Sequence, residues 1–193
     1  MFAIVPLAIR GCCWNACRTY SATMGRINEI KHLLSGEQKQ FTDLERWRLE
    51  EGKLAVARWI APEDNPFQLP PGTTSWGVWT MSIPHITAYR IHKPNGEISK
   101  YRFDVIEKLS ICDHAVSFHD LLLDAWVDGK TKTLTLEDEC EVKSAMESSL
   151  LTTEQIRIIN TTKHYLTNET NTLLRSVDSL IDTAVQLHKN KES

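Results

Sequence analysis

Acidic residues in the second half of the chain have a spacing that could hold divalent metal ions. Asp120 and Asp124 lie four residues apart in an apolar segment, and Asp138 and Glu141 follow with i, i+3 spacing. On a strand, Asp120, Leu122 and Asp124 would share one face, and on a helix Asp138 and Glu141 would project to one side. Four carboxylates brought together repel one another unless a cation neutralises them. Their hard oxygen atoms suit Mg²⁺, Mn²⁺ or Ca²⁺ rather than Zn²⁺.

The spacing of the two aspartates restricts how they could share an ion. Residues four apart on a regular strand are separated by roughly 13 Å, too far for one ion with ligand bonds of about 2.1 Å. Either the strand carries a bulge, or two ions bind about 3.5–4 Å apart, an arrangement used in phosphoryl transfer. Asp104 is a candidate fifth ligand. The alternative is that Asp120 and Asp124 simply face water, but Leu122 and Trp126 would then be exposed with them.

Strands in the first half of the chain and helices in the last third would position these carboxylates. Asn95-Gly96 and Asp128-Gly129 are hairpin signals, because both residues of such a pair tolerate positive φ. Together the strand-like segments predict an α+β protein with a curved antiparallel β-barrel followed by C-terminal helices. The expected strands are 54–60, 73–81, 89–91, 98–105, 118–127 and 131–136.

The helical pattern begins at about residue 136. A first helix is expected to run to about Ser148, and Thr152 and Gln155 offer a capping box for one long helix over 153–188. The apolar stripe of this long helix is typical of packing surface, although it is also the face that a protein partner would use.

Composition limits the class of protein. The chain has 193 residues, 41% of them hydrophobic and 24% charged, with a net charge of −3. This allows one globular domain and argues against a disordered chain. No apolar run reaches the roughly 20 residues of a membrane span, and the charge balance argues against direct nucleic acid binding.

The N-terminal segment 1–28 has the composition of a targeting sequence. It contains Arg10, Arg18 and Arg26 but no Asp or Glu, which favours a mitochondrial (matrix) import signal. A secretory signal peptide and a frayed terminus are the alternatives. The folded domain is accordingly expected to span 29–193.

Cysteine and histidine residues carry less information. Cys112 and Cys140 form no Cys-x-x-Cys pair, which argues against a zinc ribbon. His114 and His119 could bind metal or shuttle protons, but no His-x-x-x-His spacing supports this. We therefore interpret them as ordinary loop histidines.

Three segments in order resemble the FomD-like family of metal-dependent nucleotide phosphatases, once catalogued as a domain of unknown function and also labelled ribonuclease E/G-associated. The resemblance covers about residues 38–188. The segments are Tyr101-Arg102-Phe103-Asp104, then Asp120-Leu121-Leu122-Leu123-Asp124, and then Asp138-Glu139-Cys140-Glu141.

The resemblance implies a nucleotide substrate and two divalent ions, Mg²⁺ or Mn²⁺. By position the ligands would be Asp104, Asp120, Asp124, Asp138 and Glu141, with Asp124 and Asp138 also catalytic. Tyr101 and Lys100 would bind substrate. The chain departs from the family pattern at Asp104, where Asn is common, and at Leu122, Cys140 and Ile83.

Two functions follow from this reading. The first is a divalent-metal-dependent phosphohydrolase acting on nucleoside di- or triphosphates or a related nucleotidyl compound. The second is a catalytically weakened interaction subunit or assembly factor of a mitochondrial complex that handles ribosomes or RNA, with the partner bound through helix 153–188. The phosphohydrolase predicts that the four carboxylates converge around a concave space, whereas the interaction subunit allows them to be scattered over the surface.

The targeting segment yields a direct test. We expect residues 1–20 to be dispensable for folding and to be removed on import, because their composition is that of a presequence. Mass spectrometry of the mature protein from its native cell checks this, and retention of Met1 would contradict it.

Overall fold

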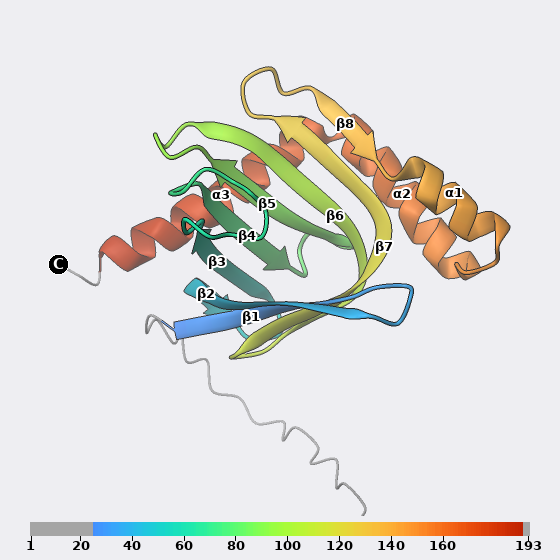
Figure 1. Ribbon diagram of the computed structural model, residues 1–193, viewed down its shortest axis with the longest axis horizontal. Helices are drawn as coiled ribbons and strands as arrows, with labels where there is room; N and C mark the ends of the chain where they lie inside the picture. Colours follow the sequence, from blue (N-terminus) through green and yellow to red (C-terminus); the bar gives the residue numbers. More distant parts are fainter. Residues whose placement is uncertain (1–24, 191–193) are drawn as a thin grey trace, which may run out of the picture.

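The computed structural model describes residues 25–190, as eight strands followed by three helices (Figure 1). The strands are β1 (Gly25–His32), β2 (Gln38–Glu50), β3 (Leu54–Ile60), β4 (Thr74–Thr80), β5 (Ile86–His92), β6 (Ile98–Ile111), β7 (Ala115–Asp128) and β8 (Leu134–Glu137). The helices are α1 (Glu139–Glu147), α2 (Thr153–Asn168) and α3 (Thr170–Lys189).

The strands form one sheet in chain order that closes on itself. Each strand pairs antiparallel with the next, and β1 also pairs with β7 in parallel, from Asn28↔Ala115 to His32↔His119. The result is a closed seven-stranded barrel, with β8 added outside the closure on β7. The expected α+β class, curved barrel and C-terminal helices are confirmed; the parallel pair that closes the barrel is not evident in the sequence.

Both predicted hairpins are present. Gly96 has φ 85°, and its N–H donates to the carbonyl of Lys93. In the second turn, Asp128 Oδ1 accepts hydrogen bonds from the backbone of Lys130 and Thr131. Gly129 is required there because a Cβ atom would lie 2.2 Å from the carbonyl oxygen of Ile98. This turn sets the register that places β8 beside Asp124.

Strand β1 corrects the expected domain boundary. Residues 25–28, assigned by composition to the targeting segment, belong to this strand, and Ile27 is fully buried. The rest of that segment, 1–24, lies outside the described residues. The sequence pattern does not predict strand β1, because its inward-facing residues include Glu29 and Lys31. These charged residues interrupt the alternation of apolar and polar residues that indicates a strand.

The expected single helix over 153–188 is two helices. The chain bends at Glu169 (φ −115°, ψ 21°), between α2 and α3. The Thr152–Gln155 capping box at the start of α2 is present. Helices α1 and α2 cover β7 and the neighbouring β6, whereas α3 lies across β2 to β5 (Figure 1).

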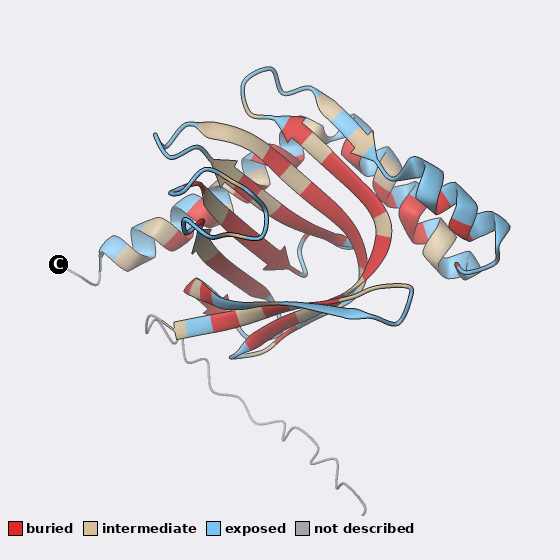
Figure 2. Cartoon of the chain, viewed as in Figure 1, coloured by how far each residue is buried: buried red, intermediate tan, exposed pale blue. Residues whose placement is uncertain are grey.

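The apolar stripe of these helices is used within the chain. Buried residues lie on the strands and on the helix faces turned toward them (Figure 2). The stripe residues buried against the outer wall of the barrel are Ile159, Leu166, Leu173, Val177 and Ala184, joined by Ile158 and Ile181. A second core lies inside the barrel, where Ile27, Ala57, Trp79, Ile106 and Phe118 are buried. None of the described helices is long and apolar enough to cross a membrane.

A substitution in α3 tests whether this helix is part of the core. Ile181 is fully buried, so Ile181→Ala should lower the free energy of unfolding by about 2–5 kcal/mol. Leu187→Ala, at a residue that is 41% exposed on the same helix, is the matched control and should cost much less. Urea denaturation measures both, and equal small effects would mean that α3 does not stabilise the barrel.

Candidate functional site

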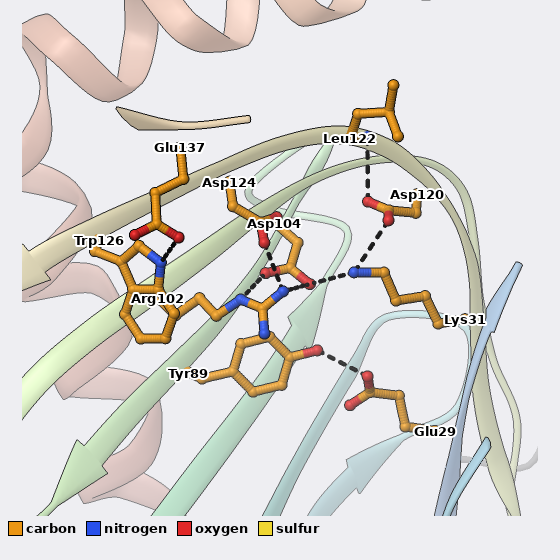
Figure 3. A network of polar contacts seen from close by, with 10 residues as sticks. All are labelled: Glu29, Lys31, Tyr89, Arg102, Asp104, Asp120, Leu122, Asp124, Trp126 and Glu137. Atoms are coloured by element: carbon orange, nitrogen blue, oxygen red, sulfur yellow. Dashed lines mark hydrogen bonds and ion pairs between the residues drawn. The ribbon is translucent and has the colours of Figure 1, made fainter. Parts of the chain in front are cut away.

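Three of the predicted carboxylates converge inside the barrel around two basic side chains (Figure 3). Lys31 Nζ lies 3.1 Å from Asp104 Oδ2 and 3.1 Å from Asp120 Oδ2. Arg102 Nη2 lies 2.6 Å from Asp124 Oδ2, and Arg102 Nε lies 2.7 Å from Asp104 Oδ1. All three aspartates are buried. We call these five residues the interior cluster.

A bulge in β7 brings Asp120 and Asp124 closer together along the strand, on the inner face of the barrel. Asp104 pairs with Asp124 and Ile106 pairs with Asp120, so three residues of β7 oppose one residue of β6. The middle residue of the three, Leu122, has φ 72°. It packs against the outer core rather than sharing a face with the aspartates, which corrects that expectation. Because a bulge shortens the distance along the strand, the spacing no longer requires two ions.

The polar network extends from the interior cluster in two directions. Tyr89 donates its hydroxyl hydrogen to Glu29 Oε1 at 3.0 Å, deeper in the barrel. Toward β8, Trp126 Nε1 donates to Glu137 Oε2 at 2.6 Å. Lys100 Nζ lies 3.8 Å from the centre of the Trp126 ring, a cation–π contact at the partly exposed end of the network.

The network contains more acids than bases at its centre. Glu29 and the three aspartates oppose only Lys31 and Arg102, so full ionisation would leave two uncompensated negative charges. The pKa of Asp124 is raised to about 7, and the pKa of Glu29 is also raised to about 7. In both cases burial is the largest cause and the negative charge of Asp104 is the second. Burial also raises the pKa of Asp120, although Lys31 opposes this.

The two bases stay charged in this environment. Burial lowers the pKa of Lys31, but the charges of Asp104 and Asp120 outweigh this effect and raise it overall. The pKa of Arg102 is likewise raised by Asp104 and Asp124 despite burial. In the interior cluster Lys31 and Arg102 are therefore charged and paired with aspartates, and the carboxyl groups with a raised pKa can still bind a proton.

The donor set suits a hard divalent cation. Asp124 Oδ1 is buried and has no hydrogen-bond partner, and Asp104 Oδ1 is not aligned with Arg102 for a hydrogen bond. Carboxylate oxygens in this state are ligands that Mg²⁺ or Mn²⁺ would accept. Among residues 25–190, no three acidic, histidine or cysteine side chains already form a metal-holding group. An ion would therefore have to displace the ammonium or guanidinium group from these oxygens.

The other predicted site residues lie elsewhere, except Lys100. Asp138 is the exposed N-cap of α1, with φ 65° and no side-chain capping bond, and Glu141 is exposed on that helix. Tyr101 is fully buried on the outer face of β6, where its hydroxyl donates to Asp178 of α3 at 2.9 Å. The structure does not bring these three residues to the interior cluster. Tyr101 points to the opposite face of β6 from Arg102 and Asp104, and Asp138 and Glu141 belong to α1, which lies outside the barrel.

Six residues of the network are absent from the site residues that the sequence predicts. Two are the bases, and the signal that could have found Arg102 is its place two residues before Asp104, on the same strand face. Glu137 pairs with Asp124 across β7 and β8, so the residue directly before Asp138, and not Asp138 itself, reaches this region. The six are Glu29, Lys31, Tyr89, Arg102, Trp126 and Glu137.

Comparison with known proteins shows a similarity of fold. No protein-family model matches the sequence, and no curated protein matches it. The structure resembles that of FomD in complex with CDP, with 11% identity, a TM-score of 0.57, and coverage of 77% of this chain and 84% of that one. It also resembles the phosphatase SC4828 with the non-hydrolyzable nucleotide GPCP, with 13% identity, a TM-score of 0.58, and coverage of 80% and 85%. The FomD-like fold is confirmed; the ribonuclease E/G association has no support.

The raised pKa of Glu29 predicts how stability depends on pH. The folded protein binds the proton of the Glu29 carboxyl group more tightly than the unfolded chain does. The contribution of this protonated group to the free energy of unfolding is therefore complete below about pH 4.5 and is lost as pH rises through about 7. Glu29→Gln should remove that decline, worth on the order of 3 kcal/mol, while keeping an acceptor for Tyr89. Urea denaturation at pH 5 and 7.5 in EDTA measures it. The exposed control Glu147→Gln should keep the wild-type slope, and a Glu29→Gln slope equal to wild type would refute the assignment.

Proposed function

We propose that this protein is a phosphohydrolase that acts on a nucleoside di- or triphosphate, or a related nucleotidyl compound, at the interior cluster. Mg²⁺ or Mn²⁺ would be held by Asp104, Asp120 and Asp124. The main support is the convergence of these three carboxylates inside the barrel, with one buried oxygen of Asp124 unpartnered. The similar folds of FomD with CDP and of a phosphatase with a nucleotide analogue agree with this proposal.

The two bases have a role that follows from charge balance. Bound divalent metal would supply Lewis-acid stabilisation of phosphate oxygens. If Asp104, Asp120 and Asp124 held a cation, Lys31 and Arg102 would lose their present partners, which are 2.6–3.1 Å away. Both bases would then be available to pair with phosphate oxygens of the substrate.

The rim of the barrel offers a further phosphate contact. Lys100 is partly exposed, and its ammonium group lies over Trp126, whose indole is held by Glu137. Lys100 and Arg102 share one face of β6, so a phosphate chain entering here would meet two cations in succession. Lys100 thus remains a proposed substrate-binding residue.

One observation favours the second function, the catalytically weakened interaction subunit. The internal ion pairs already neutralise part of the acidic charge without metal, so the fold can hold the interior cluster without a bound ion. The partner surface would differ from the expected stripe of 153–188, because most of that stripe is buried against the barrel.

Metal binding and hydrolysis distinguish the two functions. Mg²⁺ or Mn²⁺ should raise Tm, because the ion binds only the folded arrangement. The protein should also release phosphate from nucleotides. Asp124→Asn should abolish both responses, whereas Glu141→Gln, at an exposed acidic residue of α1, is the matched control and should keep them. Thermal shift and a phosphate-release assay measure these effects. Absence of both responses in the wild type would favour the interaction subunit.

Asp104→Asn tests the departure from the family pattern. The charge of Asp104 raises the pKa of both Asp124 and Glu29, so the change should lower both and leave Asp124 more ionised at neutral pH. We expect phosphate release to be preserved or increased. The same chemical change at Asp124 serves as the control, and equal loss of activity in both variants would show that Asp104 is an essential charged ligand.

A further inference from the structure

Two histidines face each other on the outside of the barrel where it closes. His32 of β1 and His119 of β7 are register partners in the parallel pair. Their ring centres are 4.9 Å apart, with a 30° angle between the planes, and both side chains are partly exposed. The interpretation of His119 as a loop histidine is wrong, because His119 lies on β7. Its partner is 87 positions away in the chain and is not evident from the sequence.

The pair is separated from the interior cluster by the barrel wall. Lys31 and Asp120, which form an ion pair inside the barrel, are the neighbours of His32 and His119 in sequence. Because successive side chains of a strand point to opposite faces, the histidines point outward. The closing seam thus has an ion pair on its inner face and two imidazoles on its outer face.

Polar groups surround the two rings. Ser117 Oγ lies 3.1 Å from His32 Nε2. Glu107 of β6 is the register partner of His119 on its other side, and Glu107 Oε1 accepts a hydrogen bond from Gln155 of α2 at 2.9 Å. Lys108 Nζ is 3.5 Å from the same carboxylate oxygen and is the nearby positive charge. The row His32, His119, Glu107 therefore presents two nitrogen donors beside a carboxylate.

We propose that His32 and His119 form a binding site for a borderline divalent transition metal of the Zn²⁺ class. Imidazole nitrogens suit Zn²⁺, Ni²⁺ and Cu²⁺, whereas Mg²⁺ and Mn²⁺ prefer the oxygen atoms of the interior cluster. With bonds of about 2.0–2.1 Å, an ion between two nitrogens requires them to be roughly 3–3.5 Å apart. Ring centres 4.9 Å apart are compatible with this separation, because the nitrogens lie on the rim of each ring. Water would complete the coordination.

A metal ion bound by His32 and His119 would cross-link two strands of the barrel. It would link the first strand of the barrel to the seventh, whose pairing is the one that closes the sheet. Ser117 orients His32 by occupying one ring nitrogen, the usual way in which a neighbouring group fixes a ligating imidazole. Binding is therefore expected to stabilise the folded barrel and to be independent of nucleotide hydrolysis.

Zinc titration of the full chain tests the proposal. Cys12, Cys13 and Cys17 are changed to Ser so that their thiols do not bind the ion. In this background Zn²⁺ at ten times Kd should raise Tm by about 4 °C, with one ion bound in calorimetry. His32→Gln and His119→Gln should each abolish the shift. His164→Gln, at an exposed histidine of α2, is the matched control and should retain it.

Two further measurements keep the proposal falsifiable. The first is NMR of the protein with all of its histidines intact. Zn²⁺ should shift the ring signals of His32 and His119, and this measurement does not depend on substituting either residue. Cys112 Sγ lies 3.9 Å from His114 Nδ1 and is the competing site. Loss of the response in Cys112→Ser instead of the His32 and His119 variants would overturn the proposal, as would a wild type without any Zn²⁺ response. Retention of the response in Asp124→Asn would show that it does not depend on the interior cluster.

Discussion

The balance of buried charge inside the barrel is the constraint on which the rest of the structure depends. Moving an ionised group out of water costs several kcal/mol unless a partner compensates, and removing one partner leaves the other uncompensated. Asp104 is 2% exposed and forms ion pairs with both Lys31 and Arg102. Its carboxylate therefore joins β6 to β1, and Lys31 and Arg102 extend the link to Asp120 and Asp124 of β7. The fold can hold this charge only while these three strands stay in register.

The architecture divides structural and functional roles between the two faces of the barrel wall. Helices α1 to α3 supply the apolar core on the outer face, so the inner face does not have to supply all of the hydrophobic stabilisation. The alternate residues of β6 follow this division: Tyr101 and Phe103 face the helices, and Arg102 and Asp104 face the interior. A polar interior of this kind is tolerated because the helices bury enough apolar surface elsewhere.

The acidic excess connects structure to function. Raised pKa values at Asp124 and Glu29 show that the folded protein holds these carboxylates at an energetic cost. The existing ion pairs with Lys31 and Arg102 reduce this cost, and a bound cation or proton would reduce it further. The proposed hydrolase uses a cation, whereas the proposed interaction subunit keeps the ion pairs. One arrangement of residues supports both, and the response to metal separates them.

The sequence by itself determined the elements whose signals are local. The Asn95-Gly96 and Asp128-Gly129 turns, the capping box of α2 and the apolar stripe are all set by residues within a few positions of one another, and each is present. The aspartates at 104, 120 and 124 were also identified, because charges in apolar strands stand out. Tertiary structure decided the partners. The parallel closure of β1 on β7 brings Lys31 to Asp120 and His32 to His119, and the bulge at Leu122 turns that leucine outward and brings Asp120 closer to Asp124. These contacts join residues almost 90 positions apart, and no local pattern encodes such a pairing.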